Sequence, residues 1–465
     1  MFFIVINVNL WEACFDFLPF ILIFVAKNHY KILLMKYKVF TRVFLTMALT
    51  IPFSCTSEAP ENVHSKSVQQ TEDDQVVQLG EDLYDSFSFK LTRNQDASNQ
   101  EEKLPDYFGG SYTDSQDGLV VLIKGMDKEG INDIYQRIGK HDNLKFKPCT
   151  YSLQELRNLK EKLSDIYFSD ENKRKDLQWF SVGISIEKNR IVVFLEDVSS
   201  CAIKKFKKEV LDSPMIIFEE MHEAQDLSYI VVDSIGNDDL LARATTKTNI
   251  HLGAAITLSG SGYIATGSVG FRAMRGSDHG FVTAAHVVPT TGLTVNFNSK
   301  ACGTSVATTR GPKAEAAFVK VHYSNFYPTN VAQWTKTATA ANVISYDNLV
   351  NRNVVLEGST TKKAIEATVF TIDNSREVTI QTVAGSYKFS LSNVVYAKLS
   401  NQTISSQPKA GDSGGVIYDK STKRICGELQ GSATSTSKGI TTYFLTFSSA
   451  EKALSALGAS ITWNK

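Results

Sequence analysis

Gly411-Asp-Ser-Gly-Gly415 lies in the longer run Lys409-Ala-Gly-Asp-Ser-Gly-Gly-Val-Ile-Tyr418, near the end of a chain of 465 residues. A serine in a glycine-flanked turn exposes its hydroxyl and lets a carbonyl substrate approach closely. The backbone N–H groups of Gly411 and Ser413 can then converge as an oxyanion hole. A nucleophilic serine also needs a base and a group that orients the base. Taken alone the stretch can also be a simple tight turn, so the rest of the chain must decide.

The best candidate base is His286, in Gly280-Phe-Val-Thr-Ala-Ala-His-Val-Val288. A predicted strand ends there in small residues and the histidine follows, at a strand end, where functional residues concentrate. Taken alone, a core histidine bonded to backbone is the simpler interpretation. Together with Ser413 downstream, the pattern favours a base.

Short runs rich in β-formers alternate with turn residues after about residue 248, at a spacing near ten residues. This pattern predicts an antiparallel barrel or sandwich. A capped helix beginning near Ser448 and ending at Gly458 closes the chain. Residues 106–245 instead predict a small α+β unit. It has a capping box at Ser152–Glu155 and a hairpin turning at Lys188-Asn189.

These motifs together resemble the chymotrypsin-like serine proteases, and most closely the bacterial branch of the streptogrisins and α-lytic protease. The resemblance implies an all-β catalytic domain of two perpendicular six-stranded antiparallel β-barrels with a C-terminal helix, over residues 246–465. It implies an α+β pro-region over residues 106–245 that assists folding, docks on the catalytic domain and is cleaved. Further stretches that carry the resemblance are Gly267-Ser-Val-Gly-Phe271, Gly358-Ser-Thr-Thr361, Gly439–Phe444, Ile184–Val193 and Ser213–Phe218.

The orienting acid departs from the family pattern. An aspartate should stand at the head of a strand between histidine and serine, and the only fit is Glu315, in Ala314-Glu-Ala-Ala-Phe-Val-Lys-Val321. Glutamate performs this role in some α/β-hydrolases, but its extra methylene means that the carboxylate must tilt or retreat. Asp347 and Asp373, both in turn-like contexts, rank below Glu315.

Six cysteines are thinly spread and none has metal-ligand spacing, so no metal or other cofactor is expected. Gly267 and Val287 occupy the positions of one family disulfide, which suggests a domain that folds without it. A different bridge between Cys302 and Cys426, or free thiols throughout, both remain open.

The net charge is zero but unevenly divided. Residues 248–465 hold 20 Lys and Arg against 11 Asp and Glu, and residues 1–247 hold 29 against 38. Opposite net charges of +9 and −9 are consistent with a pro-region that docks on the catalytic domain. The basic residues are scattered without aromatic interleaving, so nucleic acid is not an expected partner.

The amino-terminal part predicts export. Met35-Lys-Tyr-Lys, an apolar stretch and small residues near Cys55 read as a signal peptide over residues 35–55, with residues 1–34 as an upstream extension. Cys55 is a candidate lipid anchor of the bacterial lipoprotein type, and plain secretory cleavage is the alternative. Residues 56–105 are polar and predict a flexible segment. Residues 240–250, with Arg243 and Lys247, predict a cleavable linker.

The resulting hypothesis is a secreted or cell-envelope serine endopeptidase made as a proenzyme and acting on polypeptides. Its site residues are Ser413, His286, Glu315 and Gly411. The wall of the substrate pocket is expected from Glu428–Ser432 and its floor from Gln407–Ala410, with a preference for small or medium uncharged residues. The alternatives are a protease fold that has lost catalysis, for which Glu315 is the reason, and a β-rich adhesion module.

Overall fold

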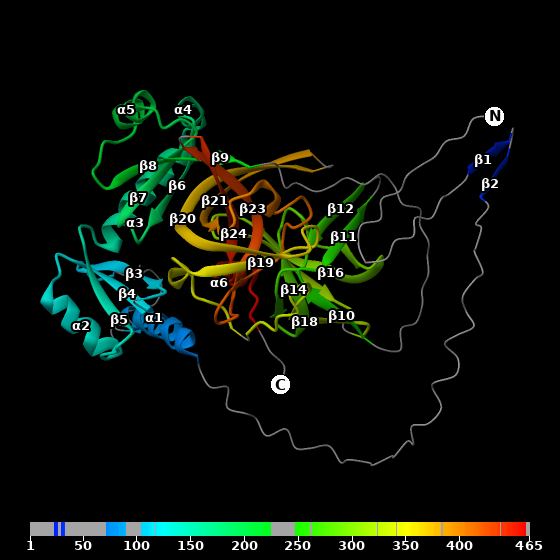
Figure 1. Ribbon diagram of the computed structural model, residues 1–465, viewed down its shortest axis with the longest axis horizontal. Helices are drawn as coiled ribbons and strands as arrows, with labels where there is room; N and C mark the ends of the chain where they lie inside the picture. Colours follow the sequence, from blue (N-terminus) through cyan, green and yellow to red (C-terminus); the bar gives the residue numbers. More distant parts are fainter. Residues whose placement is uncertain are drawn as a thin grey trace, which may run out of the picture. The chain divides into compact units, whose positions relative to one another are not determined.

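The computed structural model describes residues 23–26, 29–32, 71–89, 104–116, 118–224 and 247–461, the last range without 261–262, 323, 341, 383–384 and 438 (Figure 1). Strands β1 (Ile23–Ala26) and β2 (His29–Ile32) form an antiparallel pair in a separate unit, Met1–Val68. The predicted signal peptide and Cys55 lie outside the described residues. Of the helices described, none is both long and apolar enough to cross a membrane.

An unexpected helix begins the second compact unit. Helix α1 (Glu72–Phe89) buries Val76, Leu79, Leu83 and Phe87 on one face. Spacings of three and four residues place these side chains in a single stripe. The prediction of a flexible segment over residues 56–105 is therefore wrong for α1. Acidic and polar residues around the apolar stripe dominate the composition of this segment, so composition alone does not reveal the helix.

The first half of the α+β unit (residues 71–224) is a three-stranded sheet in the order β3-β4-β5. Strands β4 and β5 are parallel, so helix α2 makes the crossover between them. The elements are β3 (Phe108–Asp114), β4 (Gly118–Lys124), α2 (Lys128–Ile138) and β5 (Leu144–Cys149).

The second half of the α+β unit confirms the sequence patterns. The capping box at Ser152 and Glu155 begins helix α3, and Asn189 turns the β6–β7 hairpin with a φ of +49°. The elements are α3 (Leu153–Ser169), α4 (Glu171–Asp176), β6 (Trp179–Ser185), β7 (Arg190–Leu195), α5 (Ser200–Glu209), β8 (Ile216–Glu220) and β9 (His222–Glu223).

The β-rich domain (residues 247–461) has two halves. Its first half is an antiparallel sheet in the order β12-β11-β15-β16-β17-β14-β13, beside a parallel pair of β10 and β18. The strands are β10 (Thr248–Leu252), β11 (Ala255–Gly260), β12 (Tyr263–Ser268), β13 (Arg272–Arg275), β14 (Asp278–Thr283), β15 (Thr294–Phe297), β16 (Lys300–Arg310), β17 (Glu315–Val321) and β18 (Phe326–Ala332).

The second half is a closed barrel of six strands. The order β19-β22-β23-β24-β21-β20 closes because β20 also pairs with β19. Its elements are η1 (Tyr346–Asn348), β19 (Asn353–Glu357), β20 (Ala364–Thr382), β21 (Gly385–Leu399), η2 (Ile404–Ser406), β22 (Val416–Asp419), β23 (Ile425–Ser437) and β24 (Ile440–Ser449). The predicted last helix is α6 (Ala450–Leu457), capped by Ser449 and ended by Gly458 at φ +61°.

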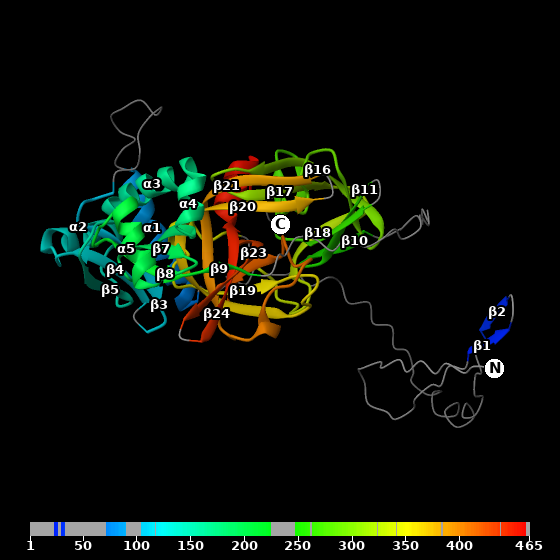
Figure 2. The same cartoon turned by 90° about the horizontal axis from the view of Figure 1, so that it is seen from above.

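The α+β unit and the barrel share one sheet and one core (Figure 2). Strand β6 pairs antiparallel with the long strand β20, with Ile184 opposite Ile372 and Val182 opposite Ser375. Val182, Ile184 and Ile372 belong to the same buried apolar cluster. The expected docking of the two regions is thus a continuous β-sheet.

The cysteines of the described chain are all free thiols: Cys149, Cys201, Cys302 and Cys426. The alternative of a Cys302–Cys426 bridge is wrong, because the two side chains are buried in different apolar clusters. Position 267 has no room for the cysteine of the family disulfide, for a packing reason. A side chain there would lie 2.4 Å from Val287, which already fills the space.

Candidate active site

His286 and Glu315 meet because their strands are antiparallel neighbours. Strand β14 pairs with β17, with Thr283 opposite Ala317. His286 follows the end of β14 and Glu315 begins β17, so both lie at the same edge of the sheet. Their side chains are 5% and 2% exposed, which makes this a nearly dry contact.

Glu315 holds the histidine at two points. Nδ1 of His286 lies 3.1 Å from both carboxylate oxygens of Glu315, and the His286 backbone N–H donates to Oε1. The Glu315 backbone N–H donates to the Ser448 hydroxyl at 3.1 Å. The longer side chain therefore reaches the imidazole Nδ1 with both oxygens, and the extra methylene is accommodated.

The turn that carries Ser413 is fixed by its aspartate. The buried Asp412 carboxylate accepts the backbone N–H groups of Thr360 (2.8 Å), Thr361 (2.9 Å) and Lys409 (2.8 Å), and also the Thr361 hydroxyl. Hydrogen bonds to an ionised acceptor are the strong ones. The aspartate before the serine thus has a structural task, which the motif alone did not reveal.

Two glycines of this turn have positive φ, where side chains are disfavoured. Gly411 has φ +94° and Gly414 has φ +79°. The Gly411 N–H donates to none of the described residues, whereas the Gly414 N–H donates to the Leu429 carbonyl at 2.8 Å. Gly411 therefore presents an available donor beside Ser413, as an oxyanion hole requires.

The serine turn packs directly on the segment that leads to His286. A side chain on Gly414 would lie 2.1 Å from the Thr283 hydroxyl and 2.8 Å from the Ala284 nitrogen. Ser268 ties the two together: its N–H donates to the Ser413 carbonyl at 2.8 Å, and its own carbonyl accepts the Thr283 hydroxyl at 2.8 Å. The structure thus brings the four predicted site residues into one region between the two halves.

The lower-ranked acids lie elsewhere. Asp347 pairs with Arg157 of the α+β unit at 2.5 Å, and Asp373 lies 3.8 Å from the same arginine. Neither is hydrogen-bonded to His286. Within the described part of the chain, no three His, Cys, Asp or Glu side chains gather as a metal site would need.

Glu428, whose direction the sequence leaves open, does not reach solvent. Its side chain is fully buried on β23, so it offers no charge to a substrate pocket. Sequence reasoning placed it in the pocket wall. Its position near Glu315 depends on a contact between the two halves, which has no local signal.

Two sequence families match the front half of the chain. Residues 58–149 match the family described as Pro-like N-terminal domain, and residues 154–221 match the Pro-like C-terminal domain. These two families describe the pro-region of α-lytic-type proteases, and both matches lie within residues 58–221. The α+β unit overlaps these matches and is called the pro-region below, and the sheets of the β-rich domain are consistent with the chymotrypsin-like fold.

Solved structures of proteases are similar to slightly less than half of the chain. Thermobifida fusca protease A is 18% identical, over 47% of this chain and 100% of its own, with a TM-score of 0.34. A Nocardiopsis protease is 21% identical, over 46% and 100%, also at 0.34. The α-lytic protease homolog N4 is 19% identical, over 46% and 100%, at 0.32. No curated protein sequence matches the chain.

The last strand of the pro-region lies on the barrel beside the candidate site. Strand β9 pairs antiparallel with β23, with Glu223 opposite Ala433 and His222 opposite Thr434. The Ala224 N–H then donates to the Ser432 carbonyl at 3.4 Å. A peptide in extended conformation thus already occupies the edge of the predicted pocket wall.

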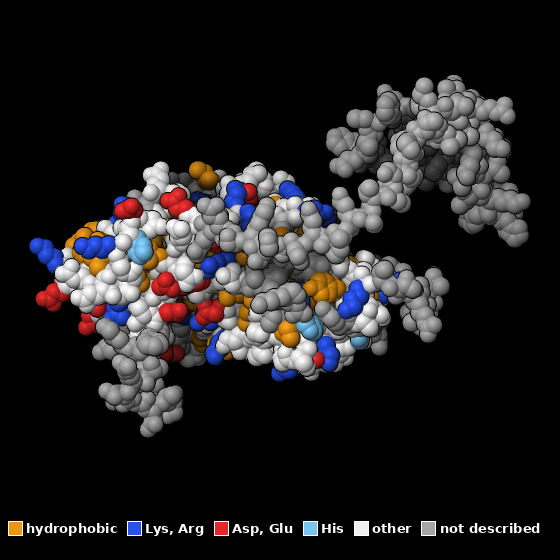
Figure 3. All heavy atoms as spheres, turned by 90° about the horizontal axis from the view of Figure 1, so that it is seen from below, with side chains coloured by type: hydrophobic (Ala, Val, Ile, Leu, Met, Phe, Trp, Pro, Cys, Tyr) orange, Lys and Arg blue, Asp and Glu red, His pale blue; other side chains and the backbone are white. Residues whose placement is uncertain are grey.

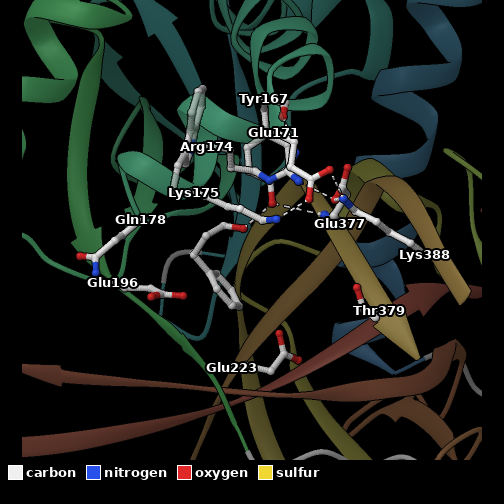
Figure 4. A pocket seen from close by; sticks show the side chains of 12 residues that line it. Tyr167, Glu171, Arg174, Lys175, Gln178, Glu196, Glu223, Glu377, Thr379 and Lys388 are labelled. Carbon is white, nitrogen blue, oxygen red and sulfur yellow. Dashed lines mark hydrogen bonds and ion pairs between the residues drawn. The ribbon is translucent and has the colours of Figure 1, made fainter. Parts of the chain in front are cut away.

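Ion pairs line a pocket between the pro-region and strands β20 and β21 (Figure 4). Glu377 of β20 binds Arg174 at 2.5 Å and Lys388 at 2.7 Å, and Lys388 also binds Glu171 at 2.7 Å. Arg174 and Glu171 belong to the pro-region, so it contributes both signs of charge. Lys, Arg, Asp and Glu side chains are likewise mixed over the face drawn in Figure 3. The surfaces of the pro-region and the barrel are therefore complementary through individual ion pairs, and not only through their opposite net charges.

Proposed function

We propose that this chain is a serine endopeptidase made as a proenzyme. Ser413 attacks the scissile carbonyl, and His286 takes the serine proton and later gives it to the leaving amine. Glu315 orients the imidazole and stabilises the imidazolium. The N–H groups of Gly411 and Ser413 stabilise the oxyanion of the tetrahedral intermediate.

One observation carries the proposal: a buried carboxylate lies 3.1 Å, through both oxygens, from His286 Nδ1. This contact leaves Nε2 of the ring as the nitrogen that can accept the proton of Ser413, whose turn packs on the same segment. A fold that had abandoned catalysis has no evident use for a buried, aligned acid and histidine next to a Gly-Asp-Ser-Gly-Gly turn.

The position of β9 supports a polypeptide substrate. An extended chain that adds to β23 is held by backbone hydrogen bonds, as in other peptide-recognition sites that extend a sheet. Because β9 and Ala224 occupy this edge, the pro-region competes with substrate until it is released. The proenzyme is accordingly inhibited by its own chain.

We place the enzyme outside the cytoplasm, secreted or in the cell envelope. The support is the export pattern over residues 35–55, and Cys55 is the proposed point of lipid attachment. Mass spectrometry of the mature amino terminus distinguishes a lipidated Cys55 from plain cleavage nearby.

Labelling with a fluorophosphonate tests the activity, because this reagent reacts with an activated serine. The chain from residue 56 onward is compared with Ser413→Ala and Glu315→Ala, after processing. Labelling of the natural sequence but not of Ser413→Ala supports the proposal, and weak labelling of Glu315→Ala assigns the acid. A folded, processed protein that does not label at all contradicts it and leaves an inactive protease fold.

A further inference from the structure

Glu428 is a buried carboxyl group without a partner. Its side chain is 0% exposed, and neither oxygen takes part in a hydrogen bond. Among the described residues no lysine, arginine or histidine forms an ion pair with it. A carboxyl group in this state is rare, because burial of an unpaired polar group is costly.

The surroundings of Glu428 come from both halves of the β-rich domain. On β23 it stands opposite Val416 of β22 and Ser448 of β24. Across the boundary, its Cβ lies 3.3 Å from where a side chain on Gly270 would begin. None of these three neighbours carries a charge, and among the described residues Glu315 is the charged group whose field reaches Glu428.

The nearby hydrogen-bond donors are already committed. The Ser448 hydroxyl accepts the Glu315 N–H and the Gln430 side-chain N–H (2.6 Å), and it faces the Glu315 carbonyl oxygen at 3.4 Å. Ser448 thus connects the backbone of Glu315 to the strand that carries Glu428. No other donor is provided for the Glu428 carboxyl in the described structure.

Two carboxyl groups in one dry space do not both ionise. Glu315 faces the His286 backbone N–H and Nδ1, whereas Glu428 has no hydrogen-bond partner among the described residues. Burial first, and the charge of Glu315 second, raise the pKa of Glu428 well above its usual range. Burial without a partner therefore favours the protonated form of Glu428.

We propose that Glu428 is a positioning residue: a neutral carboxylic acid whose O–H is the hydrogen-bond donor for the far side of the Glu315 carboxylate. A glutamate has one more rotatable bond than an aspartate, so it needs more restraint to keep both oxygens on the imidazole. The protonated Glu428 supplies that restraint. Its effect on catalysis rests on the proposed function, whereas its protonation does not.

Nuclear magnetic resonance tests the protonation directly. The chain from residue 56 onward, carrying Ser413→Ala and glutamate labelled with carbon-13 at the carboxyl, is compared with the same chain carrying Glu428→Gln. We expect one resonance at the position of a protonated carboxyl at pH 7, absent from Glu428→Gln. If the resonance that disappears is instead that of an ionised carboxylate, the proposal is overturned.

Kinetics test the positioning role. Glu428→Gln keeps a donor and is expected to lose at most about threefold in kcat/KM, whereas Glu428→Leu is expected to lose about tenfold or more. In Glu428→Leu the Glu315 carboxylate is less neutralised, so it stabilises the His286 imidazolium more strongly. The acidic limb of the pH profile of kcat/KM then moves to higher pH.

The control is Glu366→Leu, the same substitution at an exposed glutamate on β20, which is expected to change neither kcat/KM nor the pH profile. Equal kinetics and pH profiles for Glu428→Leu and the natural sequence overturn the positioning role, and so does a loss in Glu428→Gln as large as in Glu428→Leu. If Glu428→Leu does not fold, Glu428→Met replaces it. If the natural sequence does not label with fluorophosphonate, the proposed function fails and the resonance experiment still decides the state of Glu428.

Discussion

Among the single residues, the proposed orienting acid Glu315 is the one that most needs explanation. Glu315 replaces the aspartate that the family pattern leads one to expect, yet both of its oxygens lie 3.1 Å from the histidine. The backbone N–H groups of His286 and Glu315 are themselves bonded, to Glu315 and Ser448 respectively. The site is therefore built around a glutamate, and an aspartate would be too short for it.

Two substitutions of Glu315 are expected to reduce catalysis to different extents. Glu315→Gln removes the charge with the shape kept, and kcat/KM should fall by roughly 10³–10⁴-fold, the range seen when a triad acid is disabled. For Glu315→Asp, kcat/KM should fall less, because the charge is kept but lies farther from Nδ1. Hydrolysis of a peptide substrate at pH 7 measures both. An aspartate variant as active as the natural sequence would show that the fit is not specific to glutamate.

Asp412 should contribute to stability as well as to the shape of the turn. Asp412→Ala leaves the N–H groups of Thr360, Thr361 and Lys409 without their acceptor. We expect the free energy of unfolding to fall by about 3 kcal/mol or more, measured by urea titration in a Ser413→Ala background. Asp278→Ala, which removes a partly exposed ion pair with Lys320, is the control and should cost at most about 1 kcal/mol.

At the scale of elements, the pairing of β6 with β20 joins the pro-region to the barrel. Gly183 on β6 faces Asn374 of β20, and a Cβ there would lie 1.9 Å from the Asn374 Oδ1. Asn374 cannot easily move, because its amide donates to the Val394 carbonyl at 2.8 Å and accepts the Thr371 hydroxyl at 3.1 Å. The interface between β6 and β20 is thus closely packed at Gly183.

Gly183→Ala should weaken the interface between β6 and β20. Overpacking of this kind typically costs about 1–3 kcal/mol, seen as a lower urea midpoint of the precursor with Ser413→Ala. Gly311→Ala, at a glycine with open space around it, is the matched control and should have little effect. Combining Gly183→Ala with Asn374→Ala relieves the clash, so a double-mutant cycle without coupling would argue against this contact.

At the scale of the whole molecule, the pro-region and the barrel are one structure and not two neighbours. They share a ten-stranded sheet and a common apolar cluster that includes Ile184 and Ile372. Ion pairs of both polarities flank the shared strands, such as Arg157–Asp347 and Glu223–Arg376. Separation of the two parts therefore exposes apolar surface and strand edges, so the bound pro-region stabilises the barrel in addition to its proposed inhibitory role.

Thiol reactivity tests the fold without disulfides. Burial raises the pKa of Cys149 to about 11 and of Cys302 to about 12, and it raises the pKa of Cys426 well above its usual value. Because the thiolate is the reactive form, a raised pKa means less of it at pH 8. In the native chain from residue 56 onward, the exposed Cys201 should react first with iodoacetamide. After denaturation without reductant four thiols should react, and a smaller number would reveal a disulfide.

Several parts of this protein depend on local patterns and could be predicted from the amino-acid sequence. The strand ending in Thr283-Ala-Ala-His286, the Gly411–Gly415 turn, the capping box at Ser152 and the last helix all follow from residues close in sequence. Glu315 could also be selected, because an acid must begin a strand between His286 and Ser413. These features are set by turn chemistry, capping and periodicity, which act over a few residues.

Other features depend on contacts between residues far apart in the chain. The apolar residues of helix α1 belong to the same buried cluster as the pro-region sheet, and Gly80 of α1 packs against Asn348. Cys302 and Cys426 are buried in different apolar clusters, and Glu428 comes near Glu315 because the two halves of the domain meet there. Burial and charge proximity arise from the packing of residues far apart in the chain, so no local pattern records them.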